Sequence, residues 1–174
     1  MNFSLEKSFE LLERTPGILE LMLKDLSDEW TTNNEGPETW SPYDIVGHLL
    51  HGEQTDWIAR TKIILSNSDE KEFKPFDRFA QFEESKGKTM NQLLVEFKKA
   101  REENLRILKS FNLTKADLDK TGIHPKFGNV TLSQLLSTWT IHDLSHIAQI
   151  ARVMCKQYKD AVGPWAEYLP ILQK

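Results

Sequence analysis

The chain has 174 residues, of which 28% are charged and 39% are apolar, and its formal net charge is −4. This composition predicts one folded domain over residues 1–174 with a sizeable core, and it argues against intrinsic disorder. The acidic balance supplies no basic stripe for phosphate contacts, so we expect no nucleic-acid partner.

The N-terminus and the single cysteine predict a cytoplasmic protein. Residues 1–15, MNFSLEKSFELLERT, carry acids where a signal peptide needs an uninterrupted apolar stretch, and no window reaches the roughly 20 apolar residues of a membrane span. Cys155 has no partner for an internal disulfide, which fits a reducing compartment. We expect Cys155 to be a small buried hydrophobic residue rather than a nucleophile, and we expect no membrane contact.

The first half of the chain contains two segments with helical periodicity. Apolar residues recur at steps of three, four or seven over residues 4–25, which predicts one helix with a kink at Pro16–Gly17. A second helix is predicted over residues 42–66. Its start is well marked, because Ser41 can cap it, a proline occupies the first helical position, and Asp44 lies in the first turn.

Two further helices are predicted over residues 90–111 and 132–157. Each opens with a threonine, Thr89 or Thr131, followed three residues later by glutamine, which is the spacing of a capping box. No run of alternating residues makes a convincing strand, so the fold class is all-α.

The connections between these helices predict a bundle with crossovers. Residues 67–88 and 112–130 are rich in Gly, Pro, Lys and Asp, and they are longer than the links of a simple up-down bundle. The first link is long enough to run back along a helix, so the second and third helices can be parallel neighbours. We expect short helical turns within the links, near 77–84 and 115–119.

The motif HDLSH, residues 142–146, is the main candidate for chemistry. His142 and His146 are four residues apart on one helical face, so both imidazoles can face one metal ion. The alternative is that both histidines are polar core residues held by hydrogen bonds, because that arrangement is compatible with the same spacing. The motif also resembles the metalloprotease pattern H-E-x-x-H, but Asp143 is shorter than glutamate, and Gln149 and Arg152 replace the glycine and third histidine of a metzincin. A peptidase is therefore disfavoured, and a salt bridge or a supporting role behind the ligands is expected for Asp143.

Polar and small residues accompany the histidines and predict a polar cavity between the second and fourth helices. On the fourth helix, Thr138, Ser145 and Gln149 share the face of the pair. On the second helix, the face of His48 also carries Asp44, Gly52, Thr55 and Ala59.

The third ligand remains open at this level. His48 and His51 are three residues apart, and either can complete the site. His124 lies in the loop GIHPKFGN and is expected to be a loop residue. Cys155 is nine residues from His146, on the opposite side of the helix, and is not expected to be a ligand.

The sequence resembles the DinB-like, YfiT-like family of metalloenzymes over nearly its full length. The resemblance rests on TWSPYDIVGHLLHGEQTDWIAR at 39–60 and HPKFGNVTLSQLLSTWTIHDLSHIAQIARV at 124–153, with weaker support from TPGILELMLKDLSDEW at 15–30. It implies a four-helix bundle with up-down-down-up topology, a homodimer, and a divalent metal held by three histidines. Three nitrogen ligands suit zinc, nickel, cobalt, copper or iron, and of these we expect zinc or nickel. Carried over by position, these ligands are His48, His142 and His146.

The resemblance also implies a reaction, since some relatives use low-molecular-weight thiols. We therefore hypothesise a transferase that moves such a thiol onto an electrophilic small-molecule substrate. Gln149 and Ser145 are candidates for orienting the substrate or a metal-bound water, and Arg60 is a candidate for holding a carboxylate if it turns inward. The alternatives are a non-catalytic metal-binding or small-molecule-binding bundle and, less favoured, a hydrolase, because Asp44 is the only acid on the polar face.

Overall fold

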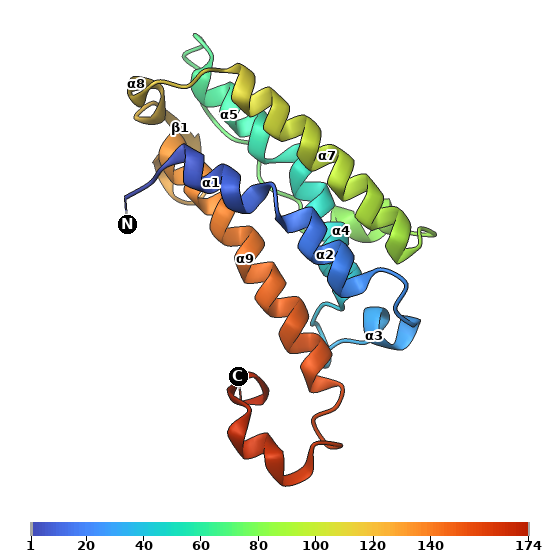
Figure 1. Cartoon of the computed structure of the whole chain (residues 1–174). Helices are drawn as coiled ribbons and strands as arrows, with labels where there is room; N and C mark the ends of the chain where they lie inside the picture. Colours follow the sequence, from blue (N-terminus) through green and yellow to red (C-terminus); the bar gives the residue numbers. More distant parts are fainter. Residues whose placement is uncertain (1, 174) are drawn as a thin grey trace.

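The computed structural model describes residues 2–173 and shows a four-helix bundle (Figure 1). The first rod is α1 (Leu5–Leu12) with α2 (Thr15–Leu23), the second is α4 (Pro42–Thr55) with α5 (Trp57–Leu65), the third is α7 (Met90–Ser110) and the fourth is α9 (Leu132–Lys156). The second and third rods run parallel to each other and antiparallel to the first and fourth (Figure 1). The predicted all-α class and the up-down-down-up topology are confirmed.

The two N-terminal rods each contain a break. The first lies at Glu13–Arg14, just before the predicted kink, because Pro16 occupies the first turn of α2. A proline lacks the N–H that a helix start leaves unpaired, so it favours a new helix there rather than a bend further on. The second break, at Asp56, was not predicted, and it divides the expected helix 42–66 into α4 and α5.

The three caps predicted from sequence are present. Ser41, Thr89 and Thr131 each accept a hydrogen bond from the backbone N–H three residues on, and the side chain at that position bonds back to the cap, which completes a capping box. Asp44 is the returning side chain of α4, so it serves the helix start.

The long links contain short elements that support the bundle. Between the main rods lie α3 (Asp28–Thr32), α6 (Ala80–Ser85), α8 (Lys115–Leu118), β1 (Thr121–His124) and β2 (Gly128–Thr131), and after α9 follow the 3₁₀ turns η1 (Gly163–Tyr168) and η2 (Pro170–Leu172). The α6 and α8 turns were expected. The antiparallel hairpin β1–β2 was not, and it corrects the expectation that no strand would form.

The hairpin is fixed by the first crossover. The backbone N–H of Phe73 donates to Ile123 at 2.9 Å, and that of Ile123 donates to Lys71 at 2.8 Å. The ring of Phe73 lies against Gly122, where any Cβ would come within 2.5 Å of it. A glycine is therefore needed at this position, and the hairpin holds the crossover against the bundle.

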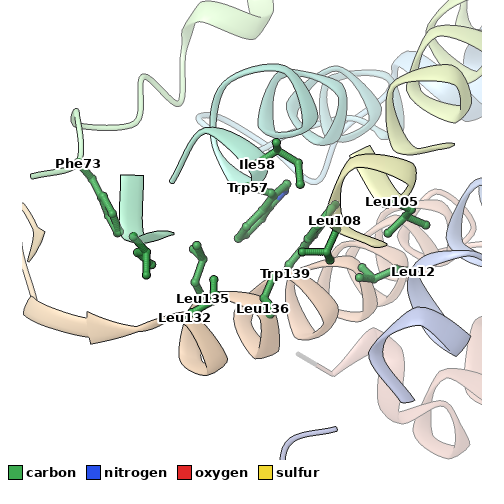
Figure 2. Packing of buried hydrophobic residues seen from close by; sticks show 11 residues of the cluster. Leu12, Trp57, Ile58, Phe73, Leu105, Leu108, Leu132, Leu135, Leu136 and Trp139 are labelled. Carbon is green, nitrogen blue, oxygen red and sulfur yellow. The ribbon is translucent and has the colours of Figure 1, made fainter. Parts of the chain in front are cut away.

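The apolar core forms two clusters along the bundle axis. The cluster at the hairpin end includes Trp57 and Trp139, whose rings stack with centroids 5.7 Å apart (Figure 2). The other cluster lies toward the far end of α9 and includes Ile45, Leu49, Phe97 and Ile150. Between them lies a buried polar network around Arg101.

Cys155 is exposed, which corrects the expectation that it would be buried; it lies near the end of α9, where the helix extends past the other rods (Figure 1). No helix within residues 2–173 is both long and apolar enough to cross a membrane.

Candidate metal centre

Three histidines from two helices meet at one point. His48 lies in the middle of α4, and His142 and His146 lie one turn apart on α9. The Nε2 atom of His142 is 3.1 Å from that of His48 and 3.1 Å from that of His146. One ring nitrogen from each of the three residues lies within 4.8 Å of the other two. The structure thus brings together the three residues that the resemblance selected.

The arrangement fits a divalent metal ion. Two nitrogens bound to one tetrahedral ion at 2.0–2.1 Å are about 3.3 Å apart, close to the spacing in this cluster. Gln149 Oε1 lies 2.9 Å from His146 Nδ1 and accepts its hydrogen, so a neutral His146 presents its Nε2 lone pair to the cluster. The Nδ1 atoms of His48 and His142 are buried without a hydrogen-bond partner among residues 2–173. If all three Nε2 atoms carry lone pairs, these lone pairs repel one another across the 3.1 Å contacts, and a cation between them removes that repulsion.

The electrostatic environment keeps the histidines neutral, which is their ligand form. Burial, reinforced by the neighbouring imidazoles, lowers the pKa of His48 to about 3 and that of His142 to about 2. Burial also lowers the pKa of His146, although Gln149 opposes it. Metal binding near neutral pH therefore does not have to displace protons from these rings.

We expect the metal-free protein to lose stability as the pH falls below about 6.5. In the unfolded chain each histidine titrates near 6.5, whereas His48 and His142 stay neutral in the folded chain until about pH 3 and 2. Between these values the unfolded state binds more protons, so the free energy of unfolding falls as the pH falls, by about 1–2 kcal/mol per histidine between pH 7 and 5. Urea denaturation of metal-free protein at both pH values measures this loss.

The His48→Gln/His142→Gln double variant is the reference for this measurement. Asp56, whose pKa burial raises to about 6, gains a proton in the same range and acts in the opposite direction, but it is present in both proteins. The difference between wild type and variant therefore isolates the two histidines. Equal losses in the two proteins would contradict the expectation.

A pocket of about 400 Å³ opens onto His48 and His146; His142 does not line it. Its walls come from the loop before α4, from the first crossover and from α9. The ring of Trp40 lies 4.8 Å from that of His48, centroid to centroid, and the ring of Phe76 lies 5.5 Å from it on another side. The remaining lining residues are polar: Glu35, Glu38, Thr39, Arg78, Gln149 and Arg152.

This location corrects the predicted cavity. The space expected beside Gly52 is filled by Trp57, whose Nε1 lies 3.3 Å from the position of a Cβ on that glycine. The Trp57 ring also contacts His142 at a centroid distance of 5.2 Å. Small residues on α4 therefore admit a tryptophan rather than leaving a void, and the opening lies toward the N-terminal half of the helix.

The other predicted site residues have different surroundings. Gln149 lines the pocket but bonds to His146, whereas Ser145 is exposed and does not line the pocket. His51 is buried outside the cluster, with its Nδ1 2.8 Å from Glu84 Oε2. His124 was expected in a loop, but it is the last residue of strand β1; it lies outside the cluster, and its Nδ1 accepts hydrogen bonds from the backbone N–H groups of Lys126 and Phe127.

Arg60 turns inward and is buried. It pairs with Asp56 at 2.5 Å, and its guanidinium lies 5.1 Å from the centre of the Phe73 ring. Its charge is therefore already neutralised, and it does not line the pocket. This contradicts the idea that Arg60 holds a substrate carboxylate.

A buried ionic network lies behind the histidines. Arg101 of α7 makes a bidentate ion pair with Asp143, at 2.6 and 2.9 Å, and a further ion pair with Glu53 of α4 at 2.8 Å. Asn104 and Trp139 each donate a hydrogen bond to the Glu53 carboxylate. Burial raises the pKa of Glu53 against the opposing effect of Arg101. Asp143 thus forms a salt bridge with Arg101, as predicted. The network also links α4 and α9, the two helices that carry the histidines.

The fold and the site together define a four-helix bundle with a three-histidine cluster beneath an open pocket. The sequence model of the DinB superfamily matches residues 11–150, and the chain belongs to this superfamily. No curated protein is significantly similar in sequence.

Two solved structures share the fold. YfiT from Bacillus subtilis, described as a probable metal-dependent hydrolase with an unusual four-helix bundle topology, superposes with a TM-score of 0.72 at 20% identity, over 91% of this chain and 87% of that one. TT2238, described as a four-helix bundle protein, superposes with a TM-score of 0.57 at 14% identity, over 85% of this chain and 98% of that one. At these identities the likeness establishes the fold alone.

Proposed function

We propose that the protein is a divalent-metal-dependent transferase that moves a low-molecular-weight thiol onto an electrophilic small molecule. The observation that carries the proposal is the convergence of three neutral imidazole nitrogens beneath an open pocket rather than within a closed core. Structural metal sites are usually closed by four protein ligands, whereas catalytic sites keep a position for water or substrate. Zinc and nickel both suit three imidazole ligands.

The residues around the pocket have distinct roles in this proposal. His48, His142 and His146 hold the ion, and Gln149 fixes the ring of His146 in the orientation that binding needs. Trp40 and Phe76 supply an apolar wall that limits water near the ion. A bound divalent cation lowers the pKa of a coordinating thiol, so that the thiol reacts as a thiolate. The sulfur forms a new carbon–sulfur bond, the leaving group departs with its bonding electron pair, and the thiol proton passes to solvent.

Two of the acids near the cluster are held in ion pairs with arginine. Glu35 is held by Arg152 in a bidentate ion pair at 2.7 and 3.1 Å, and Asp143 is held by Arg101. Neither is free to act as a general base, which a hydrolase needs beside its nucleophilic water. A thiol transferase has no such requirement, because the cation itself promotes deprotonation.

A metal-dependent hydrolase is the second candidate. YfiT is described as such an enzyme, and Glu38 lines the pocket here without an ion-pair partner among residues 2–173. The Glu38→Gln variant separates the two candidates. A hydrolase that uses Glu38 as its base is expected to lose roughly 100-fold in rate, whereas the thiol transferase is expected to keep its rate.

We expect monochlorobimane to react with a cellular thiol at least about tenfold faster in the presence of the zinc-loaded wild-type protein than with the same concentration of His142→Ala. Cysteine, glutathione, coenzyme A and bacillithiol are each measured by the fluorescence of the bimane adduct. His124→Ala, changed on the hairpin, is expected to retain the wild-type rate. If no thiol in this panel reacts faster than with His142→Ala, the transferase proposal fails, and a non-catalytic binding bundle becomes the better description.

A further inference from the structure

Arg78 is the cation of the pocket that lacks a carboxylate partner. The pocket is lined by two arginines, and Arg152 is neutralised by its bidentate pair with Glu35. Arg78 instead lies over two aromatic rings, with its guanidinium carbon 5.6 Å from the centre of Trp40 and 5.3 Å from the centre of Phe79. Within residues 2–173, no carboxylate forms an ion pair with it. Its donors are therefore free to bind a ligand.

A backbone turn and the ring of Trp40 place Arg78 near the histidine cluster. Asp77 Oδ1 accepts hydrogen bonds from the backbone N–H groups of Phe79 and Ala80, at 3.0 and 3.2 Å, which holds the turn that carries Arg78. Trp40, on which the guanidinium lies, also packs against His48. One tryptophan therefore connects the arginine and the cluster across a short apolar wall.

The charges that face the pocket favour an anionic ligand once a metal is bound. Glu35 and Glu38 contribute two negative charges, Arg78 and Arg152 contribute two positive ones, and Lys156 approaches Glu35 at 3.8 Å. These charges nearly cancel, so a divalent ion at the histidines makes the pocket strongly positive. An anion that reaches Arg78 is then attracted by both charges.

We propose that Arg78 binds the carboxylate of a small-molecule ligand whose thiol reaches the three-histidine cluster, with an apolar body packed on Trp40 and Phe76. The proposal rests on the proposed function and narrows it to a carboxylate-bearing thiol. Arg78 acts here through charge-assisted hydrogen bonds, and its planar guanidinium suits bidentate recognition of a carboxylate.

The test compares acids with their amides in cobalt(II)-loaded protein. The probes are straight-chain mercaptoalkanoates of three to six carbons and the matching primary amides, and the change in the visible cobalt spectrum gives the affinity for each. Wild type is expected to bind the best-fitting acid about tenfold more tightly than its amide. Arg78→Gln is expected to lose this preference and to bind cobalt as wild type does. Arg106→Gln, which removes an exposed arginine on α7, is the matched control and should keep the preference.

A second measurement separates this proposal from the thiol chemistry on which it rests. Phenylacetate and phenylacetamide are titrated into metal-free protein and followed by ligand NMR, so that neither sulfur nor metal contributes. A preference of wild type for the acid that Arg78→Gln lacks supports the assignment. No preference in wild type, or the same preference in Arg78→Gln, overturns it. If the mercaptans leave the cobalt spectrum unchanged while cobalt stays bound, thiol binding at the metal fails, and the phenylacetate comparison still decides the role of Arg78.

Discussion

Replacing His142 with alanine is expected to abolish metal binding. Tag-free wild-type protein that has been offered zinc or nickel should retain about one ion per chain, and His142→Ala should retain less than about a tenth of that. His142 is the central member of the cluster, because its Nε2 contacts those of both His48 and His146. Its loss leaves two nitrogens, too few for a stable site. Plasma mass spectrometry on dialysed protein gives the metal content directly.

His51→Ala is the matched control for this loss. His51 lies on the same helix as His48, one turn away, and is buried to a similar degree, but it bonds to Glu84 instead of the cluster. We expect it to retain the metal. Circular dichroism shows whether each variant is folded, and His142→Gln provides a second test if the alanine variant is not. Wild-type protein that takes up no ion, or a His142 variant that binds as wild type does, would contradict the site.

Much of the bundle could be predicted because its signals are local. The capping boxes at Thr89 and Thr131 depend on residues three apart, and both helices begin where these boxes place them. The pairing of His142 with His146 is likewise set by the helical repeat. Selecting His48 as their partner required the family resemblance, because His51 satisfies the same spacing argument and differs only in what it meets across the bundle.

The pocket could not be predicted from spacing because its walls come from connections. Trp40, Phe76 and Arg78 lie in loops, where no periodicity assigns a side chain to a face. The small residues on α4 suggested a void, but whether a void forms depends on which large side chain is near enough to fill it. Here Trp57 does so, next to an unpredicted break at Asp56.

The hairpin was missed for a related reason. Its strands are each four residues long and pair mainly with each other, so neither shows the alternation of a half-buried strand. One strand is also held by backbone hydrogen bonds to residues 71–73, which lie some 50 positions earlier. A contact of that kind leaves no trace in a short sequence window.

The buried ionic network could have been predicted from the positions of its charged residues in the sequence. Arg101 lies four residues after Phe97 and seven before Leu108, which places it on the apolar stripe of α7. Asp143 lies four after Trp139 and seven before Ile150, on the apolar stripe of α9. A charge on such a stripe requires a buried partner of opposite sign, and the two residues are each other's partner.

This network leads to the second large effect that we expect. Arg101→Ala should lower the free energy of unfolding by about 3–5 kcal/mol, because it leaves the buried carboxylates of Glu53 and Asp143 without their cation. Arg101 is 1% exposed, and it also donates a hydrogen bond to the backbone carbonyl of Leu12. Water therefore has little access to the carboxylates and the carbonyl that lose their donor. Chemical denaturation near pH 7 measures the loss, and we expect it to appear in metal-free protein as well, because the network does not include the histidine cluster.

Arg106→Ala, one and a half turns along the same helix, is the control for this change. Arg106 pairs with Glu103 at 2.6 Å, but both side chains are more than half exposed, so its removal should lower the free energy of unfolding far less than the loss of Arg101 does. The contrast tests burial rather than the presence of an ion pair. Losses within about 0.5 kcal/mol of each other would show that Arg101 is not what holds α4, α7 and α9 together. A large loss confined to Arg101, in metal-free protein, would show instead that the buried ionic network of Arg101 with Glu53 and Asp143 stabilises the helices that carry the three histidines without a metal ion.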